Sequence, residues 1–201
     1  KGVILAGNND ATYLRRGEII TVPTENLFRD PFKLEFPGIG LLEVYPNRDS
    51  ISYKEIYGIP ETQTMFRGTF RYEGWCEILD ALKKLKLISP DKFEMTGMTY
   101  AALMHHQLRK LQGAGESEAS RGTTRGASAD IPELIHEVAK FLGVEVNSTP
   151  ISAIKWLGLF RDEPMNRSID STFEVVSDLM IGKMGLGNEE RDMVVMQHMF
   201  L

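Results

Sequence analysis

The chain has very little cysteine and no surplus of positive charge. Its 201 residues include one cysteine, Cys76, so an intramolecular disulfide is excluded and a reducing intracellular compartment is expected. The formal net charge is −5 at pH 7. Because binding to nucleic-acid phosphates requires clustered lysine and arginine, this charge argues against a nucleic-acid partner. We expect a protein of the cytoplasm or the mitochondrial matrix rather than a secreted one.

Long apolar runs and the signatures of several enzyme classes are also missing. No stretch of about 18 apolar residues occurs, so no membrane segment and no membrane partner are expected. No Gly-x-Gly-x-x-Gly follows a predicted strand, which predicts no Rossmann domain and no cofactor-binding residue within this chain. The sequence also lacks a Gly-x-Ser-x-Gly elbow and a Gly-Lys-Ser/Thr phosphate loop. No metal site is predicted, because metal-ligand spacing is absent among the four histidines His105, His106, His136 and His198.

Hydrophobic residues make up 42% of the whole chain, which is enough for a packed core. Short β-like runs fill the first third of the chain. Residues 18–22 and 41–45 each read as a strand bounded by glycine and proline. In the run 65–71, Phe66 and Phe70 alternate with Arg67, Thr69 and Arg71. A period of two places the two arginines and the threonine on one face of this strand and the aromatic rings on the other.

From Gly74 onward the apolar residues recur at intervals of three and four, which indicates amphipathic helices. One helix is expected to begin at the capping box of Asp130 and Glu133 and to end at Gly143. Another is expected to begin at Thr149, followed by proline at the first helical position. The expected helices cover residues 75–85, 100–111, 130–143, 149–157 and 170–184, and residues 193–196 are expected to form a further strand.

These patterns predict an α+β protein, with a mixed β-sheet domain and an inserted all-α subdomain. We place the first part of the sheet domain at residues 1–74, the helical insertion at 75–188 and the returning strand at 189–201. Residues 113–130 are rich in small and polar residues, so a flexible loop is expected there. Because the chain opens at Lys1 without methionine, we expect it to be a piece of a longer protein.

Arginines near the predicted strand ends are the candidate ligand-binding residues. Arg48 follows the strand 41–45 on a short polar turn, a position where sheet proteins often bind ligands. Its guanidinium suits a carboxylate, but a surface ion pair with Asp49 or Glu55 is about equally favoured by the pattern. For Arg67 and Arg71, a solvated edge strand is the favoured interpretation from the pattern alone. Cys76 is interpreted as a buried core thiol rather than a nucleophile.

Taken together, these motifs resemble the glutamate-forming saccharopine dehydrogenases, including the dehydrogenase half of the aminoadipic semialdehyde synthases. The resemblance runs from about Ile19 to Val195 and is weakest across residues 113–130. Several ordered motifs at compatible spacing are more specific than any one of them. The motifs are Tyr45-Pro46-Asn47-Arg48-Asp49-Ser50, residues 53–61, residues 66–74, Trp156-Leu157-Gly158-Leu159-Phe160 and Glu190-Arg191-Asp192-Met193-Val194-Val195.

The resemblance implies the substrate-binding part of an NADP-dependent enzyme that interconverts saccharopine with glutamate and aminoadipate semialdehyde. It implies a homodimer and a Rossmann domain, outside this chain, that binds NADP. It also implies that Arg48, Thr69, Phe70 and Arg71 contact saccharopine, while the general acid or base is unknown. Two alternatives stay open, namely a noncatalytic helical interaction module on the same scaffold and a related dehydrogenase for a polyamine-precursor imine.

Overall fold

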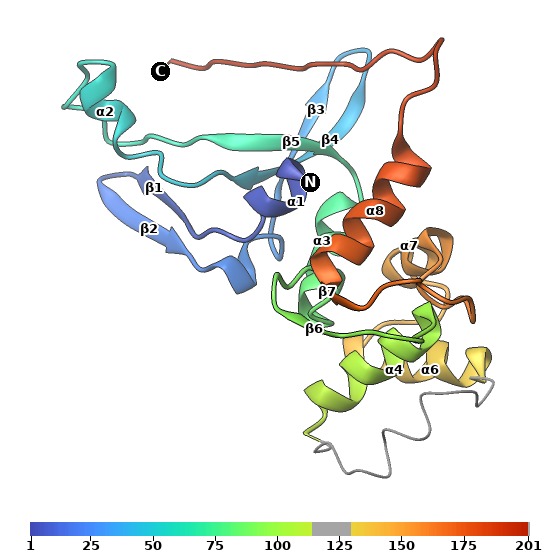
Figure 1. Cartoon of the computed structure of the whole chain (residues 1–201). Coiled ribbons are helices and arrows are strands. Elements are labelled where there is room, and N and C mark those ends of the chain that lie inside the picture. The colour runs from blue at the N-terminus through green and yellow to red at the C-terminus, as the bar shows by residue number, and fades with distance from the viewer. Residues whose placement is uncertain (114–129, 201) are drawn as a thin grey trace.

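The computed structural model describes residues 1–113 and 130–200 of the chain. Most of the flexible loop expected at residues 113–130 therefore lies outside the described residues. Figure 1 shows the strands of the first third gathered on one side of the molecule, and the longer helices, which follow later in the chain, on the other. This arrangement confirms the α+β class.

The sheet region contains two separate antiparallel sheets. β1 (Ala11–Arg15) pairs with β2 (Glu18–Val22), and β4 lies between β3 and β5 in a sheet of order β3-β4-β5. The three strands of that sheet are β3 (Phe32–Phe36), β4 (Gly40–Pro46) and β5 (Gly68–Tyr72). Three short helices complete this region, namely α1 (Gly2–Ala6), the 3-10 helix η1 (Thr24–Asn26) and α2 (Tyr53–Ile56).

The helical region follows directly after β5 and contains a further two-stranded sheet. Its helices match the expected ranges closely, because each carries local signals for its start and its apolar face. The helices are α3 (Trp75–Lys84), α4 (Tyr100–Leu111), α6 (Ile131–Leu142), α7 (Thr149–Leu157) and α8 (Thr172–Met184). The small sheet pairs β6 (Lys92–Glu94) with β7 (Ile169–Ser171).

One hydrophobic core joins the sheet region to the helices. Leu79 and Leu82 of α3 are almost completely buried and belong to the same cluster as Phe28 and Tyr45 from the sheet region. Burying each such side chain contributes roughly 1.5–3 kcal/mol. Helix α3 therefore anchors the helical region against the face of the sheet that carries Tyr45.

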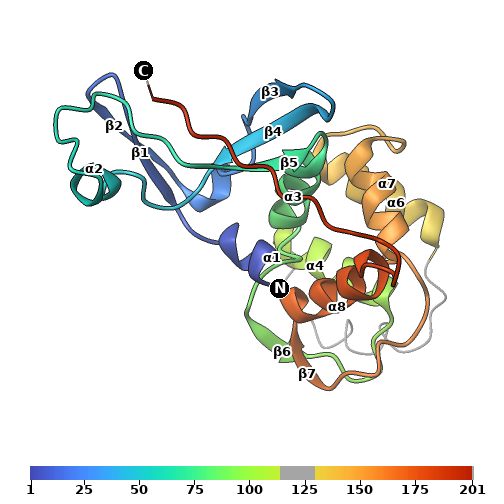
Figure 2. The ribbon, with the colours of Figure 1, turned by 90° about the horizontal axis from the view of Figure 1, so that it is seen from above.

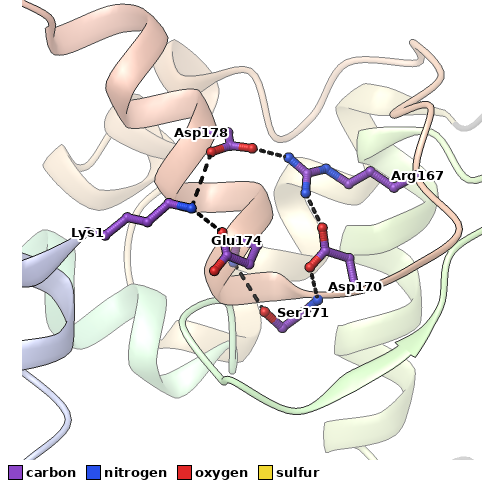
Figure 3. Close-up of polar contacts among 6 residues, drawn as sticks. All are labelled: Lys1, Arg167, Asp170, Ser171, Glu174 and Asp178. Atoms are coloured by element: carbon purple, nitrogen blue, oxygen red, sulfur yellow. Dashed lines mark hydrogen bonds and ion pairs between the residues drawn. The ribbon is translucent and has the colours of Figure 1, made fainter.

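Charged contacts add a second connection between the start of the chain and α8 (Figure 3). The ammonium group of Lys1 lies 2.5 Å from Glu174 and 4.0 Å from Asp178. Arg167 lies on the loop before β7 and pairs with both Asp170 and Asp178. These residues link the chain start, the loop before β7 and the first turns of α8.

Several expected boundaries are wrong for identifiable reasons. The strand predicted at 65–71 joins the sheet only from Gly68, because Met65 pairs instead with Leu14 of β1. The residue that precedes α7 as its N-cap is Ser148 rather than Thr149. Helix α8 starts at Thr172 because Ser171 caps it, its side-chain oxygen accepting a hydrogen bond from the backbone N–H of Glu174.

Residues 193–196 do not form the expected strand. From α8 the chain runs back across the molecule, and Figures 1 and 2 both show it passing β5 toward α2. Residues 191–200 have no regular secondary structure. Within the described residues, no backbone hydrogen bond links this segment to a neighbouring strand, so its apolar pattern alone is insufficient for sheet formation.

Candidate functional site

The candidate site is built on the pairing of β4 with β5. The register places Glu43 opposite Arg71 and Tyr45 opposite Thr69, so these four residues share one face of the sheet. Phe70 lies on the other face, where its ring packs edge-to-face against Phe36 with centroids 4.9 Å apart. The alternation predicted for this strand is therefore present in the structure.

Arg71 is held by an aromatic ring and a backbone carbonyl. Its guanidinium lies 5.4 Å from the centre of the Trp75 ring, and its Nη1 donates a 2.8 Å hydrogen bond to the carbonyl oxygen of Phe70. Among the residues that the structure describes, no carboxylate forms an ion pair with Arg71. A half-buried guanidinium that lacks a carboxylate partner is suited to binding an anionic ligand.

Glu43 lies directly beside Arg71 in the register but is used for a structural purpose. It is only 5% exposed, and its two oxygens accept hydrogen bonds from the backbone N–H groups of Gly74 (3.1 Å) and Cys76 (2.9 Å). The carboxylate thus occupies the N-terminus of α3, where helix N–H groups and the helix dipole favour a negative charge. This contact fixes the turn that carries Trp75 beneath Arg71.

Cys76 is buried at this turn. Burial first, and the negative charge of Glu43 second, raise the pKa of the Cys76 thiol far above its usual range. The thiol therefore stays protonated, which supports the interpretation of Cys76 as a core residue rather than a nucleophile.

Arg48 lies at the opposite end of the same strand pair. It follows β4 on the loop that leads to α2, adopts a left-handed conformation with φ of 51°, and is exposed. Its carbonyl oxygen accepts a 2.9 Å hydrogen bond from the N–H of Thr12, which ties the loop to β1. Within the described residues, neither the Asp49 nor the Glu55 ion pair that the pattern allowed is formed.

The carboxylate of Asp49 is engaged elsewhere. It accepts hydrogen bonds from the backbone N–H groups of Ile51 (2.8 Å) and Ser52 (3.3 Å), and the bonds from Ser52 and Ile51 lower the pKa of Asp49. Ser52 is the N-cap residue of α2, but its side chain makes no capping hydrogen bond to that helix. Asp49 therefore orders the loop that carries Arg48 instead of neutralising it.

A groove of about 920 Å³ runs along the edge strand β5. It is lined by residues of β5, of the range 57–67 and of the extended segment 193–200. Figure 2 shows this extended segment passing alongside β5. Thr69, Phe70 and Arg71 line this groove, whereas Arg48 does not. The structure thus brings three of the four predicted residues together and places the fourth on a neighbouring loop.

Two residues of this site were missed by sequence reasoning. Glu43 is a single charge within the apolar run Leu41-Leu42-Glu43-Val44-Tyr45, and that isolation was the available signal. Trp75 was interpreted only as a helix residue, because its stacking under Arg71 depends on the turn at Gly74. The positive φ of 89° at Gly74 explains why glycine is needed there.

The histidines do not form a metal-ion site in the described part of the chain, and His198 lies on the lining of the groove. His106 stacks on Phe93 with centroids 4.9 Å apart, and burial lowers the pKa of the neighbouring His105. Among the described residues, no group of three or more His, Cys, Asp or Glu side chains is placed to hold a metal ion. Among the same residues, no helix is long and apolar enough to cross a membrane.

Comparison with known proteins places the chain in a family. All 201 residues match the family described as saccharopine dehydrogenase C-terminal domain. The chain is 33% identical over 205 residues to saccharopine dehydrogenase [NADP(+), L-glutamate-forming] of Saccharomyces cerevisiae, spanning 100% of this chain and 42% of the yeast protein. It is 33% identical over 207 residues to the mitochondrial alpha-aminoadipic semialdehyde synthase of Bos taurus, spanning 99% of this chain and 20% of that protein.

The fold agrees with the sequence relationship. The apo histidine-tagged saccharopine dehydrogenase (L-Glu forming) from Saccharomyces cerevisiae superposes with a TM-score of 0.61 at 28% identity, covering 93% of this chain and 39% of the yeast chain. The chain thus spans less than half the length of these relatives. On the sequence match and the shared fold, the chain belongs to the saccharopine dehydrogenase C-terminal domain family.

Proposed function

We propose that this chain is the substrate-binding part of an NADP-dependent saccharopine dehydrogenase, which interconverts saccharopine with glutamate and 2-aminoadipate 6-semialdehyde. The observation that carries the proposal is Arg71, whose guanidinium is fixed by Trp75 and lies beside Thr69 without a carboxylate partner among the described residues. Relatives named for saccharopine dehydrogenase at 33% identity support the choice of substrate.

Saccharopine carries three carboxylates on two amino-acid skeletons joined through a secondary amine. Arginine is the side chain best suited to hold a carboxylate, since its planar fork donates two parallel hydrogen bonds. In this proposal Arg71 and Arg48 bind carboxylates, Thr69 donates a hydrogen bond, and Phe70 contributes to the wall of the groove. Because guanidinium does not titrate in the working pH range, the arginines position the substrate and transfer no proton.

We place the dinucleotide site outside the described residues of this chain. The strand β5 leads through Gly74 into α3, but the N-terminus of α3 is already occupied by the carboxylate of Glu43, which leaves no N–H cradle for a pyrophosphate. The NADP named for the yeast relative is therefore proposed to bind outside this chain. The residues of this chain are assigned to binding and orientation of the substrate.

Kinetics of the intact enzyme test the proposal. Arg71→Gln and Arg48→Ala should each raise KM for saccharopine on the order of tenfold or more, because each removes a charge-assisted hydrogen-bonding partner. KM for NADP should stay within about twofold, since neither residue is assigned to the cofactor. Arg161→Gln is the matched control, because Arg161 is already paired with Glu163 at 3.0 Å.

Unchanged saccharopine kinetics in both variants would contradict the proposal. A parallel rise in the KM values for saccharopine and NADP would indicate general damage to the fold. The homodimer expected from the resemblance stays a prediction, which sedimentation of the intact enzyme checks.

A further inference from the structure

Among the residues that the structure describes, three arginines lie over aromatic rings, and only one of these three forms an ion pair with a carboxylate. Arg161 lies 4.8 Å from the centre of the Tyr100 ring and pairs with Glu163. Arg71 lies over Trp75 and Arg67 lies over Tyr53, the latter at 4.1 Å, and neither forms an ion pair within the described chain. Arg67 therefore shares the features of Arg71 rather than those of Arg161.

The surroundings of Arg67 hold its guanidinium in a fixed place. Nη1 donates a 3.2 Å hydrogen bond to the carbonyl oxygen of Asp49, and the ring of Tyr53 supports the guanidinium plane. The backbone N–H of Arg67 donates a 3.0 Å hydrogen bond to the hydroxyl of Ser50, which is completely buried. Such a pre-positioned guanidinium loses little conformational freedom when it binds a ligand.

Most of the N–H donors of the Arg67 guanidinium make no hydrogen bond within the described residues. A guanidinium has five N–H donors, and the only side-chain hydrogen bond of Arg67 within the described residues is the one to Asp49. The pKa of Asp49 is lowered mainly by hydrogen bonds from Ser52 and Ile51, and the nearby positive charge of Arg67 adds to this effect. The Asp49 carboxylate accepts hydrogen bonds from the N–H groups of Ile51 and Ser52 and forms no ion pair with Arg67. Within the described residues, Arg67 thus forms no ion pair although it is half-buried.

The position of Arg67 relates it to the groove and to Arg71. The carbonyl oxygen of Arg67 accepts a 2.9 Å hydrogen bond from the N–H of Asn47, which extends the β4–β5 pairing to this residue. Arg67 directly precedes β5, which carries Thr69 and Arg71, and all three residues line the groove. At about 3.3 Å per residue, the Cα atoms of Arg67 and Arg71 are roughly 13 Å apart.

We propose that Arg67, seated on Tyr53, is a second carboxylate-binding subsite, and that its separation from Arg71 selects extended substrates with carboxylates at both ends. This inference rests on the proposed function, to which it adds the basis for recognising substrate length. A short or singly charged acid reaches one guanidinium only, whereas an extended dicarboxylate reaches both. The subsite takes a carboxylate because the fork of Arg67 has parallel N–H donors and forms no ion pair with a carboxylate among the described residues.

Inhibition of the intact enzyme by two matched series of acids tests the subsite. Unbranched dicarboxylates from glutarate to sebacate are compared, as competitors of saccharopine, with monocarboxylates of the same chain length. In the unchanged enzyme, the longer dicarboxylates should inhibit on the order of tenfold more strongly than their monocarboxylate counterparts. In Arg67→Gln this preference should disappear, while inhibition by the monocarboxylates changes by less than about twofold.

Companion variants separate binding from structure. Arg67→Lys retains the charge without the two parallel donors. It should therefore keep the fold and retain only part of the preference for dicarboxylates over monocarboxylates. Tyr53→Leu removes the ring beneath the guanidinium and should weaken the preference in the same direction. Arg161→Gln removes an equally stacked arginine that has its own carboxylate, and it should leave the preference unchanged.

The outcomes distinguish this inference from the proposed function. If Arg67→Gln and Arg67→Lys keep the full preference for dicarboxylates, or weaken both series of acids equally, the subsite is refuted. That result leaves the proposed function intact as long as Arg71→Gln and Arg48→Ala still raise KM for saccharopine. If those two variants have no effect, the proposed function itself is refuted, whatever Arg67 does.

Discussion

At the scale of single residues, the site depends on Glu43, a buried charge in an otherwise apolar strand. A carboxylate at 5% exposure costs free energy unless hydrogen bonds replace its water shell, and here the N–H groups of Gly74 and Cys76 do so. The same two bonds position the first turn of α3. One residue thus links β4, the helical region and the aromatic ring beneath Arg71.

Replacing Glu43 should therefore destabilise the protein more than replacing an exposed glutamate. Glu43→Ala leaves buried N–H groups at the start of α3 without an acceptor and should lower the free energy of unfolding by about 2–3 kcal/mol. Glu43→Gln keeps one acceptor oxygen and should lower it less. Urea unfolding monitored by circular dichroism measures both changes.

Glu77→Ala is the control for this comparison. Glu77 lies in the first turn of the same helix but is exposed, so its removal should cost only a few tenths of a kcal/mol. Equal losses for Glu43→Ala and Glu77→Ala would show that the buried carboxylate has no special role.

At the scale of elements, the β4–β5 pairing depends on the absence of a side chain at Gly68. A Cβ atom at this position would lie 2.4 Å from Cγ1 of Val44 and 2.7 Å from the ring of Phe66. Both distances are too short for carbon atoms in contact, so an added methyl group has to move the ring or the strand. Gly68 begins the strand that carries Thr69 and Arg71.

Gly68→Ala should consequently weaken the pairing and disturb the site together. We expect a loss of roughly 1–3 kcal/mol in the free energy of unfolding, the usual cost of overpacking. In the intact enzyme, KM for saccharopine should also rise, because a shift of β5 moves Arg71. Thermal unfolding and saccharopine kinetics measure the two effects.

Gly182→Ala provides a matched control within α8. No atom lies within 4 Å of a Cβ added there, and the residue is exposed in a helix. Alanine should stabilise that helix by up to about 1 kcal/mol. If Gly68→Ala behaved like Gly182→Ala, the close contacts at β5 would not limit the fold.

At the scale of the whole molecule, contacts distant in sequence join the sheet region to the helices. The ammonium group of Lys83 on α3 donates to the carbonyl oxygen of Thr24 at 2.5 Å and to its hydroxyl at 2.7 Å, and it also contacts the carbonyl oxygen of Gly7. Burial lowers the pKa of Lys83. The charged contacts around Arg167 and Lys1 perform a similar function at α8 (Figure 3).

Arg167 is the central residue of that charged group. Arg167→Gln leaves Asp170 and Asp178 without their shared partner and should reduce the free energy of unfolding by roughly 1 kcal/mol at low salt. The loss should become smaller in 1 M NaCl, where the screening length is about 3 Å. Denaturant unfolding at two salt concentrations tests this, with the exposed Lys155→Gln as control. A loss independent of salt would indicate that Arg167 acts through packing.

Much of the helical region was predictable because its signals are local. The Asp130 side chain accepts a 3.1 Å hydrogen bond from the N–H of Glu133, and Gly143 adopts a φ of 71° after α6, as the capping pattern predicts. Strands were harder to predict. β1 and β3 were missed although Phe32-Lys33-Leu34-Glu35-Phe36 alternates, since a strand is stabilised by a partner distant in sequence.

The sequence by itself determined the α+β class, the helices and the alternation of Phe66 and Phe70 with Arg67, Thr69 and Arg71. It left the partners of those arginines undecided between surface ion pairs and a ligand, because a pattern contains no distances. Only the tertiary structure placed Trp75 under Arg71 and Tyr53 under Arg67. It also left both arginines without an ion pair among the described residues, because the nearby carboxylates of Glu43 and Asp49 accept hydrogen bonds from backbone N–H groups. The physical reason is that periodicity fixes the face of a strand, whereas the charge balance of a site depends on groups brought together by folding.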